Sequence, residues 1–97
     1  MRDYTIQALK QAIRVVEALS SQEQSAFSLD ALTAATDISR NTVFRTLCTL
    51  KDSAWVVDAP GGYRLGPALI RLSEDYRKLI EHRRRALDEE EKGYLGE

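Results

Sequence analysis

The stretch between Asp37 and Asp52 contains no aspartate or glutamate, although the whole chain has 15 acidic and 14 basic residues. The same stretch holds Arg40, Asn41 and Arg45, together with three threonines. Arginine can pair bidentately with the edge of a guanine, asparagine can do so with an adenine, and threonine hydroxyls bind phosphates. Because DNA is an acidic polymer, a surface that binds it must present donors and exclude carboxylates. The composition of this stretch therefore favours a helix that contacts DNA.

Nucleophilic and metal chemistry have few residues to draw on. Cys48 is the single cysteine of the chain and His82 its single histidine. A zinc site takes several Cys or His ligands, and a nucleophilic site needs a base next to the nucleophile. We therefore expect no enzyme, no metal site and no cofactor. Cys48 is interpreted as a small packing residue and His82 as a surface residue.

Length and charge limit the classes of function. A chain of 97 residues is long enough for one small domain. Its net charge of −1 argues against coating nucleic acid by bulk attraction, but it allows a local patch. Residues 1–72 carry eight basic and seven acidic residues, whereas residues 73–97 carry six and eight. No apolar run is long enough to enter a membrane, so we expect a cytoplasmic protein without a membrane partner.

Residues 4–20 are predicted to form a first helix, because apolar side chains recur at intervals of three and four positions. This stripe is expected to face the core. Ser28 then offers an N-cap for a short second helix. The stripe consists of Ile6, Leu9, Ile13, Val16 and Leu19.

A third helix is predicted over residues 40–52, with Ser39 as its N-cap. Val43 and Leu47 face inward, with Phe44 beside them. A helical wheel puts the polar side chains of this helix on the opposite, exposed side. The segment without acid is therefore expected to be a surface as well. The alternative is that its composition is chance in a helix that only packs.

A β-hairpin is predicted next, because residues 55–57 and 63–65 form two short segments with aromatic and β-branched side chains. Pro60 presets φ for the second position of a turn, and Gly61 can adopt the positive φ that a type II turn needs at its third position. Pro67 can then open a long helix. Leucines and a tyrosine follow at a/d spacing on that helix and either pair with a second copy or fold back on the first helix.

This order of elements is that of a winged helix-turn-helix domain. The predicted fold is mainly α with a small β-hairpin. We expect the winged helix-turn-helix over residues 1–66. The long C-terminal helix, with its acidic tail, is expected over residues 67–97.

The segments DALTAATDISRNTVFRTLCTLKDSAWV and GGYRLGPAL resemble the DNA-binding domain of the IclR-type (isocitrate-lyase-regulator) transcription factors. The family motif joins a Thr-Gly-Leu/Ile-Ser/Pro turn, a Ser/Asn-Thr-Val-x-Arg-x-Leu recognition helix and a Tyr-Arg-Leu-Gly wing exit. The resemblance covers residues 4–72. It implies a winged helix that binds operator DNA as a dimer. The groove-facing positions that it implies are Arg40, Asn41, Thr42 and Arg45.

The sequence departs from the family at two points. Asp37 stands where the family has glycine in the turn, and aspartate is among the better substitutes if φ is positive there. Family members also carry an effector-binding domain after the wing, whereas this chain continues with one helix. We therefore expect regulation by abundance or by a regulatory protein partner rather than by a small molecule.

The expected function is a sequence-specific DNA-binding transcription regulator, a repressor that acts as a homodimer. Helix 40–52 would lie in the major groove of double-stranded DNA and the wing, 58–64, on the backbone or in the minor groove. About three or four cations per subunit would give a log–log salt slope of about −5 to −7 for the dimer.

The alternative is a winged-helix module that binds another protein, which the near-zero net charge favours. The residues expected to contact DNA are Ser39, Arg40, Asn41, Thr42, Arg45, Thr46, Thr49, Gly61, Gly62 and Arg64. Those expected to form the dimer are Leu69, Leu72, Tyr76 and Leu79.

Overall fold

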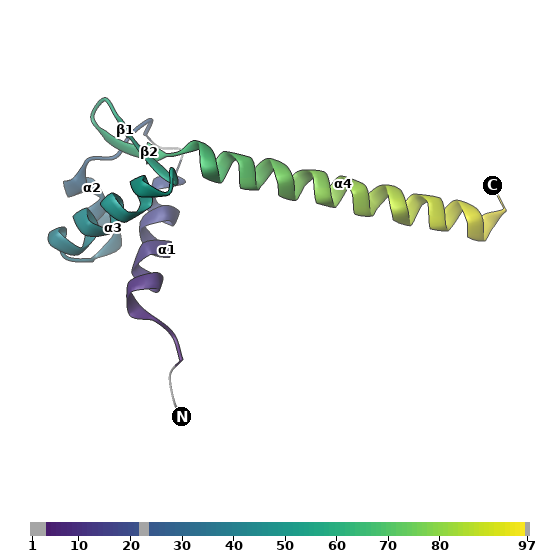
Figure 1. Ribbon diagram of the computed structural model, residues 1–97, viewed down its shortest axis with the longest axis horizontal. Coiled ribbons are helices and arrows are strands. Elements are labelled where there is room, and N and C mark those ends of the chain that lie inside the picture. Colours follow the sequence, from purple (N-terminus) through teal and green to yellow (C-terminus); the bar gives the residue numbers. More distant parts are fainter. Residues whose placement is uncertain (1–3, 22–23, 97) are drawn as a thin grey trace.

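The computed structural model describes residues 4–21 and 24–96. Three short helices and a two-stranded hairpin pack together, and one long helix leaves this unit as a straight rod (Figure 1). The predicted fold class, a winged helix-turn-helix followed by a long helix, is confirmed. The elements are α1 (Gln7–Leu19), α2 (Leu29–Thr36), α3 (Arg40–Asp52), β1 (Val56–Ala59), β2 (Gly62–Leu65) and α4 (Pro67–Leu95).

The hydrophobic core is built from every element before β2. Leu32 of α2, Leu47 of α3 and Val15 of α1 are fully buried at its centre. Because each of these helices contributes to one cluster, the helix-turn-helix is held by tertiary packing rather than by helix propensity. The buried residues of the core are Val15, Leu19, Phe27, Leu32, Ile38, Val43, Leu47 and Val56.

Helices α2 and α3 begin at the predicted serines. The Ser28 hydroxyl accepts a hydrogen bond from the Ala31 amide at 3.1 Å, and that of Ser39 accepts one from the Thr42 amide at 3.3 Å. Each bond satisfies an amide that has no partner within its helix. Between the helices the chain reverses at Asp37, which has a φ of 56° and a ψ of 34°. The condition under which aspartate is a good substitute for glycine, a positive φ, is therefore met at this position.

The predicted orientation of α1 is wrong. Ile6, Leu9 and Ile13, expected in the core, have exposed fractions of 64%, 57% and 51%. Of the predicted stripe, Leu19 is buried and Val16 is half-buried, while Val15, which lies outside the stripe, is fully buried. The helix has two apolar sides, and the one with the larger side chains faces outward.

Contacts with α2 fix this rotation of α1. The Arg14 guanidinium donates a hydrogen bond to the backbone carbonyl of Thr36, the last residue of α2. Arg14 is next to Val15 in sequence, so the same rotation that makes this bond turns Val15 into the core. A stripe of apolar residues within one helix could not reveal a contact with another helix.

The wing is an antiparallel hairpin in which Val56 pairs with Leu65 and Ala59 with Gly62. Gly61 has a φ of 92°, as the predicted turn requires. The segment before α2 adds to the sheet, because Phe27 and Tyr63 exchange two backbone hydrogen bonds of 2.9 Å. This approach needs glycine at position 62, where a Cβ atom would lie 2.1 Å from the carbonyl oxygen of Phe27. The wing is thus anchored to the helical unit.

Helix α4 has no buried residue. Leu72, Tyr76 and Leu79 are 53%, 63% and 44% exposed, so the alternative in which this face folds back on α1 is wrong. The helix also runs through the acidic segment to Leu95. Leu87 and Tyr94 continue the apolar face there, and both are exposed. None of the described helices combines the length and apolar character needed to span a bilayer.

Candidate nucleic-acid interface

The outward side of α3 presents Asn41 and Arg45, one helical turn apart. Both residues are exposed. Within the described part of the chain, neither side chain forms a hydrogen bond or an ion pair with another residue. An amide and a guanidinium on consecutive turns can reach neighbouring base edges without first giving up an internal contact.

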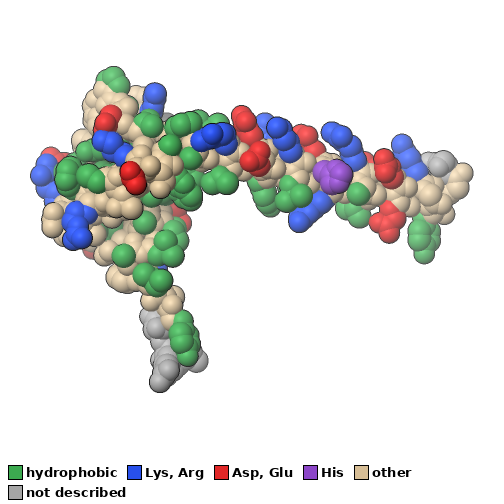
Figure 2. Space-filling view, in the orientation of Figure 1, with side chains coloured by type: hydrophobic (Ala, Val, Ile, Leu, Met, Phe, Trp, Pro, Cys, Tyr) green, Lys and Arg blue, Asp and Glu red, His purple; other side chains and the backbone are tan. Residues whose placement is uncertain are grey.

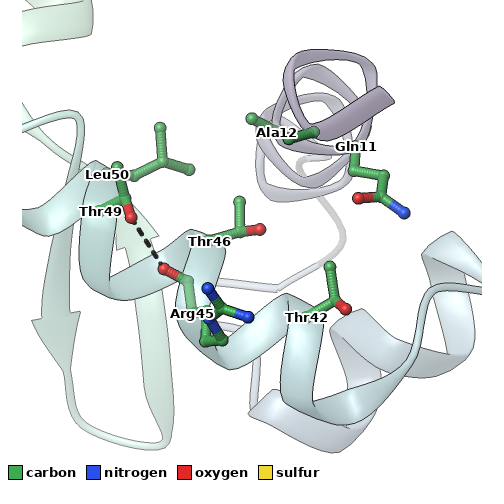
Figure 3. Close-up of a pocket in the computed structure, with 8 residues that line it drawn as sticks. Gln11, Ala12, Thr42, Arg45, Thr46, Thr49 and Leu50 are labelled. Atoms are coloured by element: carbon green, nitrogen blue, oxygen red, sulfur yellow. Dashed lines mark hydrogen bonds between the residues drawn. The ribbon is translucent and has the colours of Figure 1, made fainter. Parts of the chain in front are cut away.

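The threonines of α3 border a groove between α1 and α3. Thr42 and Thr46 are half-buried, and Gln11 of α1 lies opposite them across the groove (Figure 3). The groove is open and has a volume of about 370 Å³. The sequence did not point to Gln11, because the predicted rotation of α1 turns it away from α3.

Three of the predicted hydroxyl groups already have partners within the domain. Ser39 donates to the Thr42 hydroxyl at 2.8 Å, and Thr49 donates to the backbone carbonyl of Arg45 at 3.0 Å. The protons of Ser39 and Thr49 are therefore engaged, whereas the Thr42 hydroxyl acts as an acceptor and can still donate. The main role of the Ser39 hydroxyl is to cap the start of α3, and any contact with a ligand is secondary.

Two of the basic residues near this surface form ion pairs. Arg40 contacts Asp30 of α2 at 2.9 Å, and Lys51 contacts Asp58 of β1 at 2.8 Å. The hydrogen bond to Asp58 raises the pKa of the Lys51 ammonium, whose side chain stays exposed to solvent. Exposed pairs of this kind add little to stability. Their effect here is to reduce the local positive charge that the sequence alone suggested.

The wing residues divide into two groups. Gly61 at the tip and Arg64 on β2 are exposed, so both can meet a ligand. Gly62 is half-buried against the backbone of Phe27. The absence of a side chain at position 62 is therefore explained by packing of the wing.

Two further side chains of α3 are more exposed than the sequence suggested. Phe44 is 46% exposed, and the interpretation of Cys48 as a packing residue is wrong because its side chain is exposed. Phe44 lies one turn from Asn41 and borders Leu29 of α2. The sequence predicted that Phe44 lies beside the inward residues Val43 and Leu47, which are buried, whereas nearly half of Phe44 is exposed.

A capped third helix with an exposed Asn–Arg pair, set beside an anchored hairpin, defines a winged helix-turn-helix domain. No protein-family model matches the chain, and no curated protein matches it. Solved structures do. An IclR transcriptional regulator from Alicyclobacillus acidocaldarius is 28% identical with a TM-score of 0.72, over 78% of this chain and 31% of that protein.

Two other solved structures agree with this match. A candidate IclR transcriptional regulator from Silicibacter sp. TM1040 is 23% identical with a TM-score of 0.64, over 71% of this chain and 27% of that protein. A candidate transcriptional regulator from Rhodococcus sp. RHA1 is 26% identical with a TM-score of 0.63, over 74% and 28%. The chain thus covers less than a third of each of these proteins. The resemblance of its winged helix to the IclR-type domain is confirmed.

Proposed function

We propose that this chain is a sequence-specific DNA-binding transcription regulator that inserts α3 into the major groove. The observation that carries the proposal is the exposed pair Asn41 and Arg45, which has no internal partner among the described residues and lies on a capped helix without carboxylates. Arginine and asparagine are the side chains that pair bidentately with guanine and adenine. The similarity to transcriptional regulators supports the same function.

The wing would provide the second contact with DNA. Arg64 is exposed on β2 and Gly61 is exposed at the tip, so a phosphate could approach both the cation and the backbone. These contacts would orient the domain without reading sequence. Thr42, Thr46 and Thr49 would flank the base contacts of α3 with hydroxyl and methyl groups.

We further propose that the regulator is a homodimer joined through α4. Leu72, Tyr76 and Leu79 lie on one side of that helix and are exposed in the single chain. Hydrophobic side chains gather on the underside of α4 and on the side of α1 that faces it (Figure 2). A row of exposed apolar side chains is typical of an interface. Two α3 helices joined in this way could read two half-sites on one face of the duplex.

We propose a repressor, because a bound dimer can block other proteins. A dimer that occupies two half-sites excludes other proteins from that DNA, and this requires no further domain. Such a regulator would act in the cytoplasm, where its DNA lies. A regulatory protein partner would control its activity.

The test begins with selection of duplexes from a random double-stranded pool, followed by fluorescence anisotropy titration of the best duplex. Asn41→Ala and Arg45→Ala should each weaken binding and relax sequence preference. Arg77→Ala is the matched control, because it removes an exposed arginine from α4, far from α3. Equal losses for Arg45→Ala and Arg77→Ala would contradict the assignment of α3 as the reading helix.

A winged-helix module that binds protein is the second candidate. It is favoured by the ion pairs of Arg40 and Lys51, which leave the surface near neutrality. Failure of the pool to yield any enriched duplex, in a protein shown to be folded by circular dichroism, would support this module and exclude the regulator.

A further inference from the structure

Phe44 is the one large aromatic side chain on the outward half of α3, and it is 46% exposed. It lies outside the core cluster and forms a shallow hollow with Leu29, bordered by Arg40 and Asn41. The hollow is open and has a volume of about 460 Å³. Half of a phenylalanine is thus left in water on the same helix that presents Asn41 and Arg45.

The position of Phe44 relates the hollow to the proposed DNA surface. Phe44 follows Asn41 by three residues, and side chains three apart are neighbours on a helix. If Asn41 pairs with an adenine, Phe44 lies against the next base pair along the major groove. An apolar side chain in that groove can contact one chemical group of a base, the C5 methyl of thymine.

The charged side chains at the rim of the hollow are compatible with a contact to a thymine methyl group. Asp30 holds the Arg40 guanidinium at the rim at 2.9 Å, so the carboxylate and the cation neutralise each other. The rim therefore neither repels the duplex nor attracts it strongly. Discrimination at such a place must come from apolar contact rather than from charge.

The size of the apolar surface also favours a small occupant. A stable protein interface buries roughly 1,200 Å² or more in total. Phe44 and Leu29 are two side chains, which suffices for a methyl group but not for a partner protein.

We propose that Phe44 and Leu29 form a subsite for the methyl group of a thymine, next to the base read by Asn41. This subsite rests on the proposed DNA-binding function and adds a sequence preference to it. Phe44 is then a specificity-determining residue, and each half-site contains a thymine beside the adenine.

The experiment uses the full chain and the duplex selected from the random pool. Each thymine is replaced in turn by deoxyuridine, which keeps the hydrogen bonds of the base and lacks only the methyl group. At one position per half-site, uracil should lower affinity about fourfold, the effect of one buried methyl group. With Phe44→Ala the affinity for the thymine duplex should fall, and the uracil effect at that position should vanish.

Two variants keep this test independent of folding. Phe44→Gln retains a long side chain without the ring and should also lose the uracil effect; thermal unfolding followed by circular dichroism verifies that both Phe44 variants are folded. Asn41→Ala should retain the uracil effect while losing preference for adenine, because the two contacts are separate.

The outcomes separate the subsite from the function on which it rests. Binding of the selected duplex with no uracil effect at any position would overturn the subsite alone. A uracil effect that persists unchanged in Phe44→Ala would assign the methyl contact to another residue and overturn it too. Failure of the parent chain to bind any duplex would overturn the proposed function itself. A loss of self-association in Phe44→Ala by light scattering, without a uracil effect, would instead assign Phe44 to a protein contact.

Discussion

Arg45 and Arg64 present the same guanidinium on different elements, and we propose that Arg45 reads a base whereas Arg64 binds the backbone. Arg45 extends from the helix proposed for the groove, whereas Arg64 extends from the wing. We expect Arg45→Ala to weaken binding of the selected duplex by about 1–3 kcal/mol and to relax preference at one base pair. Arg64→Ala should weaken all duplexes to a similar degree. Anisotropy titrations against the selected duplex and its single-base variants measure both effects. A uniform loss in the Arg45 variant would show that this residue binds phosphate.

The turn before α3 depends on one left-handed residue. Asp37 has a φ of 56°, where a side chain costs about 1–2 kcal/mol for most residues and less for aspartate. Glycine has no such cost, but it loses about 0.5–1 kcal/mol through the entropy of the unfolded chain. We therefore expect Asp37→Gly to change stability by less than about 0.5 kcal/mol, whereas Asp37→Ala should lower it by about 1 kcal/mol. Urea unfolding followed by circular dichroism measures the difference. Equal stability of the Gly and Ala variants would contradict the left-handed turn.

At the scale of elements, the two glycines of the wing turn have different roles. A Cβ atom at Gly61 would meet nothing within 4 Å, so Gly61→Ala bears only the strain of a φ of 92°. At Gly62 the added atom would lie 2.1 Å from the Phe27 carbonyl oxygen. We expect Gly61→Ala to lower stability by about 1 kcal/mol and Gly62→Ala by more than about 2 kcal/mol. Thermal unfolding of the two variants tests this order. Similar losses at both positions would mean that the wing is not anchored through Phe27.

The elements also differ in how far the sequence could predict them. Helix α3 and the hairpin turn are specified locally, by the Ser39 cap and by Pro60–Gly61, so their positions could be predicted from a few adjacent residues. The rotation of α1 is set by contacts with α2, and no pattern within α1 contains that information.

The same distinction applies to the candidate site. The exposure of Asn41 and Arg45 follows from helical geometry, and the wheel predicted it. The pairing of Arg40 with Asp30 joins residues on different helices, and the exposure of Phe44 depends on how α2 packs against α3. These features required the tertiary structure.

At the scale of the whole molecule, the long helix decides whether two reading helices can act together. Leu79 lies on the apolar face of α4 and is 44% exposed, whereas Ile70 lies on another side of the helix and is 56% exposed. We expect Leu79→Asp to shift the mass measured by light scattering from a dimer toward a monomer, because a carboxylate would be buried in the joined helices. Ile70→Asp is the matched control and should leave the mass unchanged. A parent chain that is monomeric at tens of micromolar would contradict the dimer.

The balance of charge over the whole molecule makes binding less dependent on salt than the sequence suggested. Arg45 and Arg64 form no ion pair among the described residues, whereas Arg40 and Lys51 are paired with Asp30 and Asp58. Of these two available cations only Arg64 is proposed to bind phosphate, and one such cation per subunit gives a dimer a log–log salt slope of about −2, instead of −5 to −7. Asp30→Asn together with Asp58→Asn should free Arg40 and Lys51 for phosphate and steepen the slope to about −5. Asp88→Asn, in the exposed C-terminal half of α4, removes the same charge elsewhere and should change the slope little. Anisotropy titrations from low to high salt give each slope. A parent slope already near −5 would show that phosphates displace both carboxylates, and the two ion pairs would then have no effect on how the protein meets DNA.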